Sequence, residues 1–303
     1  MLRTTLIAGL VAVTAAIGGA APAAGDESEI LPVTVDNTMQ FTISASVTGR
    51  RYRIHVALPR DEPARPEGYP VIYMLDGNAT FLTGAEALRL QTRKPKGFEP
   101  AVLVAIGYET DQPFAVTERY YDYTTPAPLE NLPKRKNGEP WPERGGADAF
   151  LDFIEDDLKP EIARRLPVDP DRETLAGHSL GGFLTLYAFL TRPDSFATYV
   201  AGSPSIWWNG QELLDSAARF VKSSPDLAGK RLFIGIGANE WEDMVADAKT
   251  MADRLSVLED RGLTVRYQQF AGEEHITVLP ALISRAVSFS LIPDVDDKWF
   301  GRY

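Results

Sequence analysis

The sequence predicts an α/β fold in which helices cover both faces of a mostly parallel sheet. Short continuous apolar runs, such as residues 71–75 and 101–106, are typical of strands that are covered on both faces. Helical patterns lie between most of these runs, and alternating strands and helices indicate parallel pairing. The chain has 303 residues, of which 44% are hydrophobic, and this suits one large domain with a sizeable core.

The first two strands are expected at residues 38–46 and 51–58, where an alternating pattern and a short link predict an antiparallel pair. Two long helices are expected at residues 146–166 and 241–261, and Pro160 should kink the first helix or end its regular part. Further strands are expected at residues 71–75, 101–106, 174–177, 197–201, 231–236 and 264–270.

Residues 1–23 have the pattern of a secretory signal peptide. A basic residue precedes an apolar run, and Ala21-Pro22-Ala23 fits a cleavage site. An uncleaved N-terminal anchor is the alternative. We therefore expect a linker at residues 24–37, an α/β domain at residues 38–303, and a periplasmic or secreted protein.

Composition restricts the partners and cofactors. The net charge of −11 becomes −12 when Arg3 is removed with residues 1–23, and this argues against nucleic acid or an anionic membrane as a general partner. Cysteine is absent, which excludes disulfides, cysteine-containing metal sites and a cysteine nucleophile. The sequence shows no cluster of metal-ligating residues, so we expect no cofactor and a small-molecule partner.

Ser179 is the candidate nucleophile. It stands at the centre of Gly177-His178-Ser179-Leu180-Gly181, a G-x-S-x-G pattern between a strand signal and an apolar helix. At such a turn the glycines leave room for a crowded backbone, and the following helix N-terminus favours developing negative charge. The alternative is a glycine-rich turn with an ordinary helix-capping serine.

His275 is the candidate general base. Of the three histidines, His178 adjoins the serine and should point away from it, and His55 lies in an alternating strand far upstream. His275 follows the last expected strand, where α/β-hydrolases place their base, and the order serine, acid, histidine requires a histidine near the end of the chain. The alternative is a histidine of a surface loop.

The third member of a triad should lie in the loop after the strand at residues 231–236. Glu240, Glu242 and Asp243 crowd that loop, and Glu240 is favoured because it is nearest the end of the strand. A carboxylate there would orient the imidazole and stabilise its protonated form. Acidic residues also suit the first turn of a helix, which is the alternative for all three, and a serine–histidine dyad without an acid is open as well.

Backbone amides that can stabilise an oxyanion are expected at two turns. The segment Asp76-Gly77-Asn78 ends a strand and turns through glycine, and either Gly77 or Asn78 should supply one amide, with a slight preference for Asn78. The amide of Leu180, next to the nucleophile, should supply the second.

Three segments resemble the esterase family of α/β-hydrolases. They are Tyr-Met-Leu-Asp-Gly-Asn-Ala at 73–79, Gly-His-Ser-Leu-Gly-Gly at 177–182 and Ser-Pro-Ser-Ile-Trp-Trp at 203–208. The chain is most similar to the periplasmic siderophore branch of that family, the trilactone esterases of enterobactin and salmochelin, and residues 119–124 and 145–150 are also similar to it. The resemblance implies an α/β-hydrolase fold and hydrolysis of siderophore ester bonds, with any iron arriving with the substrate.

Residues 107–145 are rich in proline and show little periodicity, which predicts a substrate-binding rim inserted into the domain. An anionic, aromatic siderophore would need local cations and aromatic faces on a protein of negative charge. The candidate substrate-binding residues are Arg119, Arg135, Arg144, Trp207 and Trp208. A solvated loop is the alternative for the arginines, and core packing is the alternative for the tryptophans.

Three other functions share these features. A generic secreted carboxylesterase would have the same serine and histidine and differ only at the rim. A siderophore-binding protein with a vestigial triad is a second alternative, against which the intact serine, histidine and glycine turn argue. A peptidase of the same fold is a third, although the chain has no room for an additional propeller domain.

Overall fold

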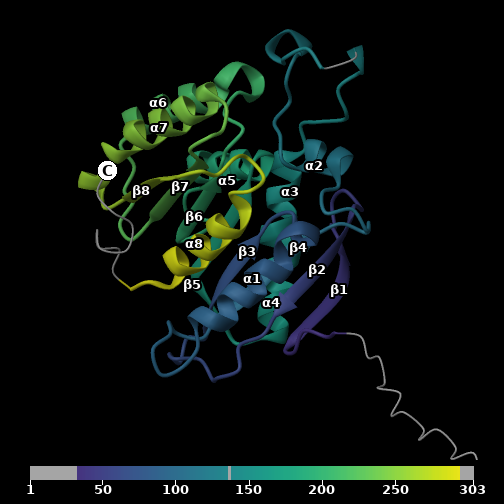
Figure 1. Ribbon diagram of the computed structural model, residues 1–303, viewed down its shortest axis with the longest axis vertical. Coiled ribbons are helices and arrows are strands. Elements are labelled where there is room, and N and C mark those ends of the chain that lie inside the picture. The colour runs from purple at the N-terminus through teal and green to yellow at the C-terminus, as the bar shows by residue number, and fades with distance from the viewer. Residues whose placement is uncertain (1–32, 136–137, 294–303) are drawn as a thin grey trace, which may run out of the picture. The chain divides into compact units, whose positions relative to one another are not determined.

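In the computed structural model, which describes residues 33–135 and 138–293, eight strands form one sheet in the order β1-β2-β4-β3-β5-β6-β7-β8 (Figure 1). β1 (Thr38–Ser44) pairs antiparallel with β2 (Arg51–Ala57), as the alternating pattern predicts. β2 also pairs antiparallel with β4, and all the remaining neighbouring strands are parallel. The predicted signal peptide lies outside the described residues.

The central strands are buried along their whole length, as their apolar runs predict. β3 (Tyr69–Met74), β4 (Val102–Gly107) and β6 (Thr198–Gly202) contain buried residues only. β7 (Arg231–Gly237) is buried after its first residue, and β8 (Thr264–Phe270) forms the far edge of the sheet.

The strand that precedes Ser179 is longer than predicted. β5 (Val168–His178) begins well before the expected start at residue 174. Its first part is polar, and the ion pair between Asp169 and Arg172 lies within it, with 2.6 Å between Oδ2 and Nε. A prediction from continuous apolar residues therefore identifies only the second, buried half of this strand.

Helices cover both faces of the sheet, which confirms the predicted fold class. On one face α1 (Gly77–Gln91) packs beside α8 (Leu279–Leu291) (Figure 1). On the other face lie α5 (Leu180–Thr191), α6 (Glu212–Ser223) and α7 (Glu242–Ser256), together with the helical segment that begins at Ala147. No helix in the described residues is both long and apolar enough to span a bilayer.

The helix expected at residues 146–166 is continuous, but its middle turn is widened. α3 (Ala147–Asp152) passes through a π-helical turn, Phe153–Leu158, into α4 (Lys159–Arg165). Pro160 stands in the first turn of α4, where a missing amide hydrogen costs little. The predicted interruption is therefore a π-helical turn that precedes the proline, and the chain does not end its helix there.

The insertion between β4 and α3 carries little regular structure. α2 (Val116–Asp122) and the short 3₁₀ turn η1 (Leu129–Asn131) are the helical elements described between residues 107 and 145. The helix α2 was not predicted, because a seven-residue helix is too short to show a clear periodicity.

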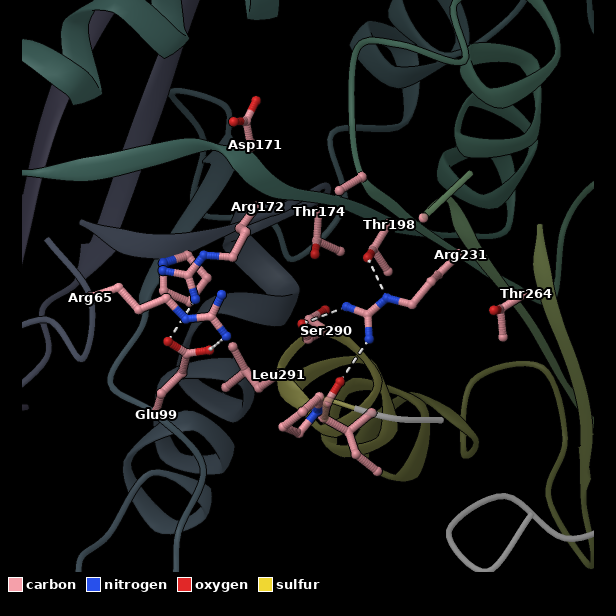
Figure 2. A pocket seen from close by; sticks show the side chains of 15 residues that line it. Arg65, Glu99, Asp171, Arg172, Thr174, Thr198, Arg231, Thr264, Ser290 and Leu291 are labelled. Atoms are coloured by element: carbon pink, nitrogen blue, oxygen red, sulfur yellow. Dashed lines mark hydrogen bonds and ion pairs between the residues drawn. The ribbon is translucent and has the colours of Figure 1, made fainter. Parts of the chain in front are cut away.

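The two ends of the parallel strands differ in the residues that they carry. Ser179, Glu240 and His275 all follow carboxyl ends of parallel strands, and these ends lie on the same side of the sheet. A cavity of about 400 Å³ lies near the opposite ends of the strands, and Arg172 and Arg231 are among the residues that line it (Figure 2). Both guanidinium groups are already hydrogen-bonded, Arg172 to Glu99 and Arg231 to carbonyl groups at the end of α8, so they stabilise the fold.

Candidate active site

Ser179 occupies a strained turn between β5 and α5. Its backbone has φ 60° and ψ −117°, a conformation that few non-glycine residues adopt. The turn is tight, because a Cβ atom at Gly177 would lie 2.4 Å from the carbonyl oxygen of Gly181. The Ser179 amide donates to the Gly202 carbonyl oxygen at 2.9 Å, so β6 holds the turn in place. The G-x-S-x-G pattern thus forms the elbow that its sequence predicts.

The structure brings together the three side chains that the sequence singled out. His275 Nε2 lies 3.0 Å from Ser179 Oγ, and His275 Nδ1 lies 2.6 Å from Glu240 Oε2. The Glu240 side chain is fully buried, whereas 35% of the His275 side chain is exposed. This is the geometry of a nucleophile, a base and a residue that orients the base.

The Glu240 carboxylate is held in its ionised form. Its Oε1 accepts hydrogen bonds from the Gly237 amide at 2.8 Å and from Ser203 Oγ at 2.6 Å. Burial acts to raise the pKa of Glu240, but the hydrogen bonds from His275, Ser203 and Gly237 outweigh it and keep that pKa below its ordinary value. An ionised carboxylate is what the orientation of His275 requires.

The rival acids have the alternative role. Glu242 and Asp243 are exposed in the first turn of α7, where a carboxylate interacts favourably with the helix dipole. Neither contacts His275. The geometry therefore favours Glu240 over both.

We expect Glu240→Gln to lower kcat at least about tenfold with KM nearly unchanged, because the change acts on His275 and leaves the substrate contacts intact. Steady-state kinetics on p-nitrophenyl butyrate would measure this. Glu242→Gln and Asp243→Asn are the matched controls and should stay near wild type. Full activity in Glu240→Gln would show that a Ser179–His275 dyad suffices.

His178 cannot serve as the base. Its ring is buried, with its centroid 4.6 Å from that of the His275 ring, and neither of its nitrogens has a hydrogen-bond partner among the described residues. Burial, with smaller effects of His275 and Arg119, lowers the pKa of His178 well below its ordinary value. The ring is therefore neutral and does not bond to Ser179.

Two helix N-termini converge beside the nucleophile. α1 begins at Gly77 and α5 begins at Leu180, and the first amides of a helix have no partner within it. Among the described residues, the amides of Gly77, Asn78 and Leu180 donate to no other backbone carbonyl. A Cβ atom at Gly181 would lie 3.6 Å from the Asp76 carboxylate, so the two turns are neighbours.

Gly77 and Asn78 also have distinct structural roles. A Cβ atom at Gly77 would lie 2.9 Å from the backbone of Ala105, so only glycine fits against β4. The side-chain amide of Asn78 forms hydrogen bonds with the backbone of Tyr108 and Thr110 and holds the loop that follows β4. Their backbone amides remain candidates for the oxyanion hole.

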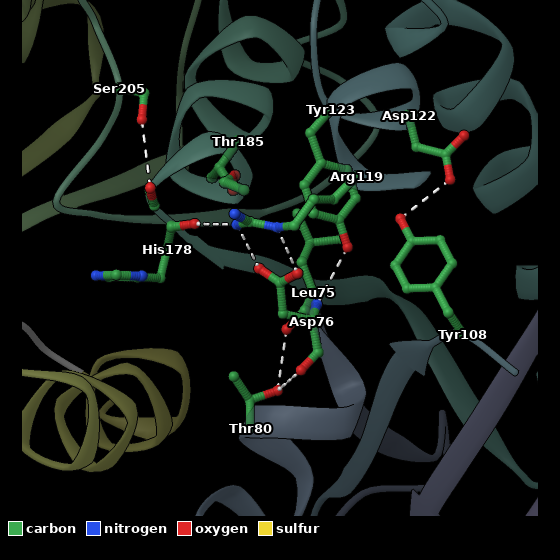
Figure 3. Close-up of polar contacts among 12 residues, drawn as sticks. Leu75, Asp76, Thr80, Tyr108, Arg119, Asp122, Tyr123, His178, Thr185 and Ser205 are labelled. Atoms are coloured by element: carbon green, nitrogen blue, oxygen red, sulfur yellow. Dashed lines mark hydrogen bonds and ion pairs between the residues drawn. The ribbon is translucent and has the colours of Figure 1, made fainter. Parts of the chain in front are cut away.

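Arg119 has a different role from the predicted one. Its guanidinium binds the buried Asp76 carboxylate through two hydrogen bonds of 2.8 and 2.9 Å, and only 12% of its side chain is exposed. Figure 3 shows the same guanidinium reaching the backbone carbonyl of His178, at 3.3 Å. Arg119 therefore braces the turn before α1 and the nucleophile elbow, and its charge is not available to a substrate.

The two adjacent tryptophans have different environments. Trp208 is fully buried and its Nε1 donates to the carbonyl oxygen of Thr125 at 3.2 Å, so the prediction that it binds substrate is wrong. Trp207 is partly exposed and lines the cavity that contains Ser179. The 3₁₀ turn that begins at Trp208 includes the left-handed residues Asn209 and Gly210, so the segment has no regular alternation from which the two environments could be predicted.

The cavity above the nucleophile has a volume of about 290 Å³ and is mostly apolar. Trp241, which is 76% exposed, lines it together with Trp207 and the buried Met244. Sequence analysis did not identify Trp241 as a site residue, because it marks the start of a predicted helix. Its position directly after the candidate acid was the available signal.

The two rim arginines lie outside this cavity. Arg135 sits over the Trp141 ring at 5.6 Å, and the Trp141 ring lies 6.3 Å from that of Trp207. Arg144 donates to the carbonyl oxygens of Ala127 and Pro142 and holds the insertion itself. Arg135 also pairs with Glu139 at 3.3 Å and donates to the Pro140 carbonyl oxygen, so both arginines have partners within the insertion. Arg135 differs in being linked to the site through the rings of Trp141 and Trp207.

Comparison with known proteins places these features in a family. A family model described as "Putative esterase" matches residues 44–286. The chain is 44% identical over 268 residues to the ferri-bacillibactin esterase BesA of Bacillus subtilis, covering 86% of this chain and 92% of that protein. It is 31% identical over 248 residues to the apo-salmochelin esterase of Escherichia coli, covering 80% and 76%.

Solved structures agree. The BES protein from Bacillus cereus superposes with a TM-score of 0.81 at 35% identity, over 87% of this chain and 99% of that one. The enterobactin hydrolase IroE, in complex with DFP, gives a TM-score of 0.66 at 26% identity, over 84% and 94%.

Proposed function

The chain belongs to the esterase family of α/β-hydrolases and is an ester hydrolase, and we propose that it is a serine esterase that cleaves the ester bonds of a siderophore. The observation that carries the proposal is the hydrogen-bonded relay from Glu240 through His275 to Ser179, at the base of an aromatic cavity. Close relatives with this function support the substrate class, since BesA is named a ferri-bacillibactin esterase.

The relay supports acyl transfer in two steps. His275 Nε2 accepts the proton of Ser179 Oγ as that oxygen attacks the ester carbonyl carbon, and Glu240 stabilises the imidazolium that forms. The amide of Leu180 and one amide at the start of α1 stabilise the oxyanion. His275 then returns the proton to the departing alcohol oxygen, and a water molecule releases the acyl group from Ser179 by the same route.

The surroundings of the cavity suit an aromatic, anionic substrate. Trp207 and Trp241 provide aromatic faces that line the cavity, and Trp141 extends this surface outward to Arg135. A ferric catecholate siderophore carries both aromatic rings and negative charge, so its rings would lie on the tryptophans with the guanidinium beyond them. Iron would enter as part of the substrate, since no group of metal-ligating side chains occurs in the described residues.

The decisive experiment is hydrolysis of enterobactin, apo and iron-loaded, followed by chromatography of the products. We expect linear and monomeric fragments that are absent with Ser179→Ala. Hydrolysis of p-nitrophenyl butyrate without cleavage of either trilactone would indicate a generic carboxylesterase. Tight binding without any hydrolysis would indicate a siderophore-binding protein.

We expect Trp241→Ala to raise KM for the trilactone about two- to tenfold, because one aromatic contact contributes about 0.5–1.5 kcal/mol. The kcat on p-nitrophenyl butyrate should change little, since that ester is too small to contact the Trp241 ring. Leu82→Ala on α1, whose side chain is 64% exposed, is the control for loss of a large exposed apolar group. An unchanged KM would exclude Trp241 from the substrate surface.

A further inference from the structure

The three residues that follow β6 connect both ends of the catalytic relay. Ser203 Oγ donates to Glu240 Oε1 at 2.6 Å. Two residues later, the Ser205 amide donates to the Ser179 carbonyl oxygen at 3.1 Å, and Ser205 Oγ lies 3.4 Å from Ser179 Oγ (Figure 3). The segment Ser203-Pro204-Ser205 therefore contacts the acid on one side and the nucleophile on the other.

This segment is held rigidly. Ser203 is fully buried, its amide donates to the Gly235 carbonyl oxygen at 2.6 Å, and its φ of 40° lies in the left-handed region. A Cβ atom at Gly182 would lie 2.5 Å from the Gly202 oxygen and 3.0 Å from Pro204 Cα, so α5 packs directly against the segment. A serine in such a conformation persists only where the surrounding structure over-determines it.

We propose that Ser203 is a positioning residue for catalysis, which fixes the rotation of the Glu240 carboxylate so that Oε2 alone faces His275. The inference rests on the relay of the proposed function. Oε1 receives two donors, the Ser203 hydroxyl and the Gly237 amide, and Oε2 receives His275 Nδ1. The terminal torsion angle of a glutamate side chain has a broad distribution, so hydrogen-bond donors to both carboxylate oxygens are needed to restrict it.

The Ser203 hydroxyl is suited to this task by its surroundings. Ser203 is fully buried, so bulk solvent does not compete with its hydroxyl as a donor to Oε1. The Gly237 amide alone would hold Oε1 from one direction only. Loss of the hydroxyl should therefore loosen the carboxylate and, through it, the imidazole, without altering any surface that the substrate contacts.

The test uses two variants that delete the hydroxyl in different ways. Ser203→Ala removes it with the backbone unchanged. Ser203→Gly removes it and also relieves the left-handed φ, so this variant should keep or raise the melting temperature. We expect both to lower kcat on p-nitrophenyl butyrate about tenfold with KM unchanged, which is the scale of one hydrogen bond to a charged group. Ser288→Ala on α8, a buried serine whose hydroxyl donates to the Arg285 carbonyl oxygen, is the control and should retain full activity.

A double-mutant cycle identifies the route of the effect. If Ser203 acts through Glu240, Ser203→Ala should lower kcat in the wild-type background and should have no further effect in Glu240→Ala. Equal losses in both backgrounds, or unchanged kcat in Ser203→Gly, would overturn the inference. Unchanged kcat in Glu240→Ala itself would instead overturn the relay, and with it the mechanism of the proposed function.

Discussion

Replacing Ser179 with alanine should abolish nearly all ester hydrolysis, with kcat lower by about 10⁴-fold or more. The nucleophile would be missing, whereas the oxyanion amides and the cavity would remain and support a small residual rate. The fold should be unaffected, because in the described part of the chain the lost hydroxyl is hydrogen-bonded to the side chains of His275 and Ser205, and its removal leaves no large cavity. Kinetics on p-nitrophenyl butyrate and on enterobactin, together with the melting temperature, measure both statements.

The matched control for Ser179→Ala is Glu242→Gln, an isosteric change on the exposed first turn of α7. Wild-type activity is expected there. Activity of Ser179→Ala within tenfold of the wild type would reject Ser179 as the nucleophile, whichever ester is used.

His275→Ala should be nearly as severe as Ser179→Ala, because the serine is a weak nucleophile until its proton is accepted. The double variant should be little worse than either single one, since residues that act as a unit are not additive. Kinetics of the three variants test this.

The exposure of His275 offers a further control. About a third of its side chain is accessible, so added imidazole can enter the space left by His275→Ala and should restore part of the activity. Ile276→Ala, which changes the exposed neighbouring residue, should behave as the wild type. Losses that multiply in the double variant would contradict the relay.

The features that could be predicted from the sequence are those with a local cause. The apolar runs of β3 and β4 predict buried parallel strands, because a strand covered on both faces needs an apolar side chain at nearly every position. The turn at Ser179 could be predicted because five consecutive residues specify it. His275 and Glu240 could be chosen as the candidate base and acid because chain order and the carboxyl ends of parallel strands restrict where such residues can lie.

Adjacent residues with different environments show where such reasoning ends. Trp207 and Trp208 are the same residue type one position apart, yet the first lines the cavity and the second is buried. Their 3₁₀ segment has no regular alternation, so nothing in the pattern distinguishes them. Which ring is buried depends on Thr125 and the rest of the insertion, far away in the chain.

By itself, the sequence determined the fold class and singled out the candidate nucleophile and base, because backbone preference, apolar pattern and chain order act over short stretches or along strand ends. Only the tertiary structure decided the partners of charged and polar groups. Arg119 is bound to Asp76, 43 residues away, and Ser203 to Glu240, 37 residues away. The physical reason is that a buried ion pair or hydrogen bond depends on which side chains packing brings within about 3 Å, and no local preference encodes that choice.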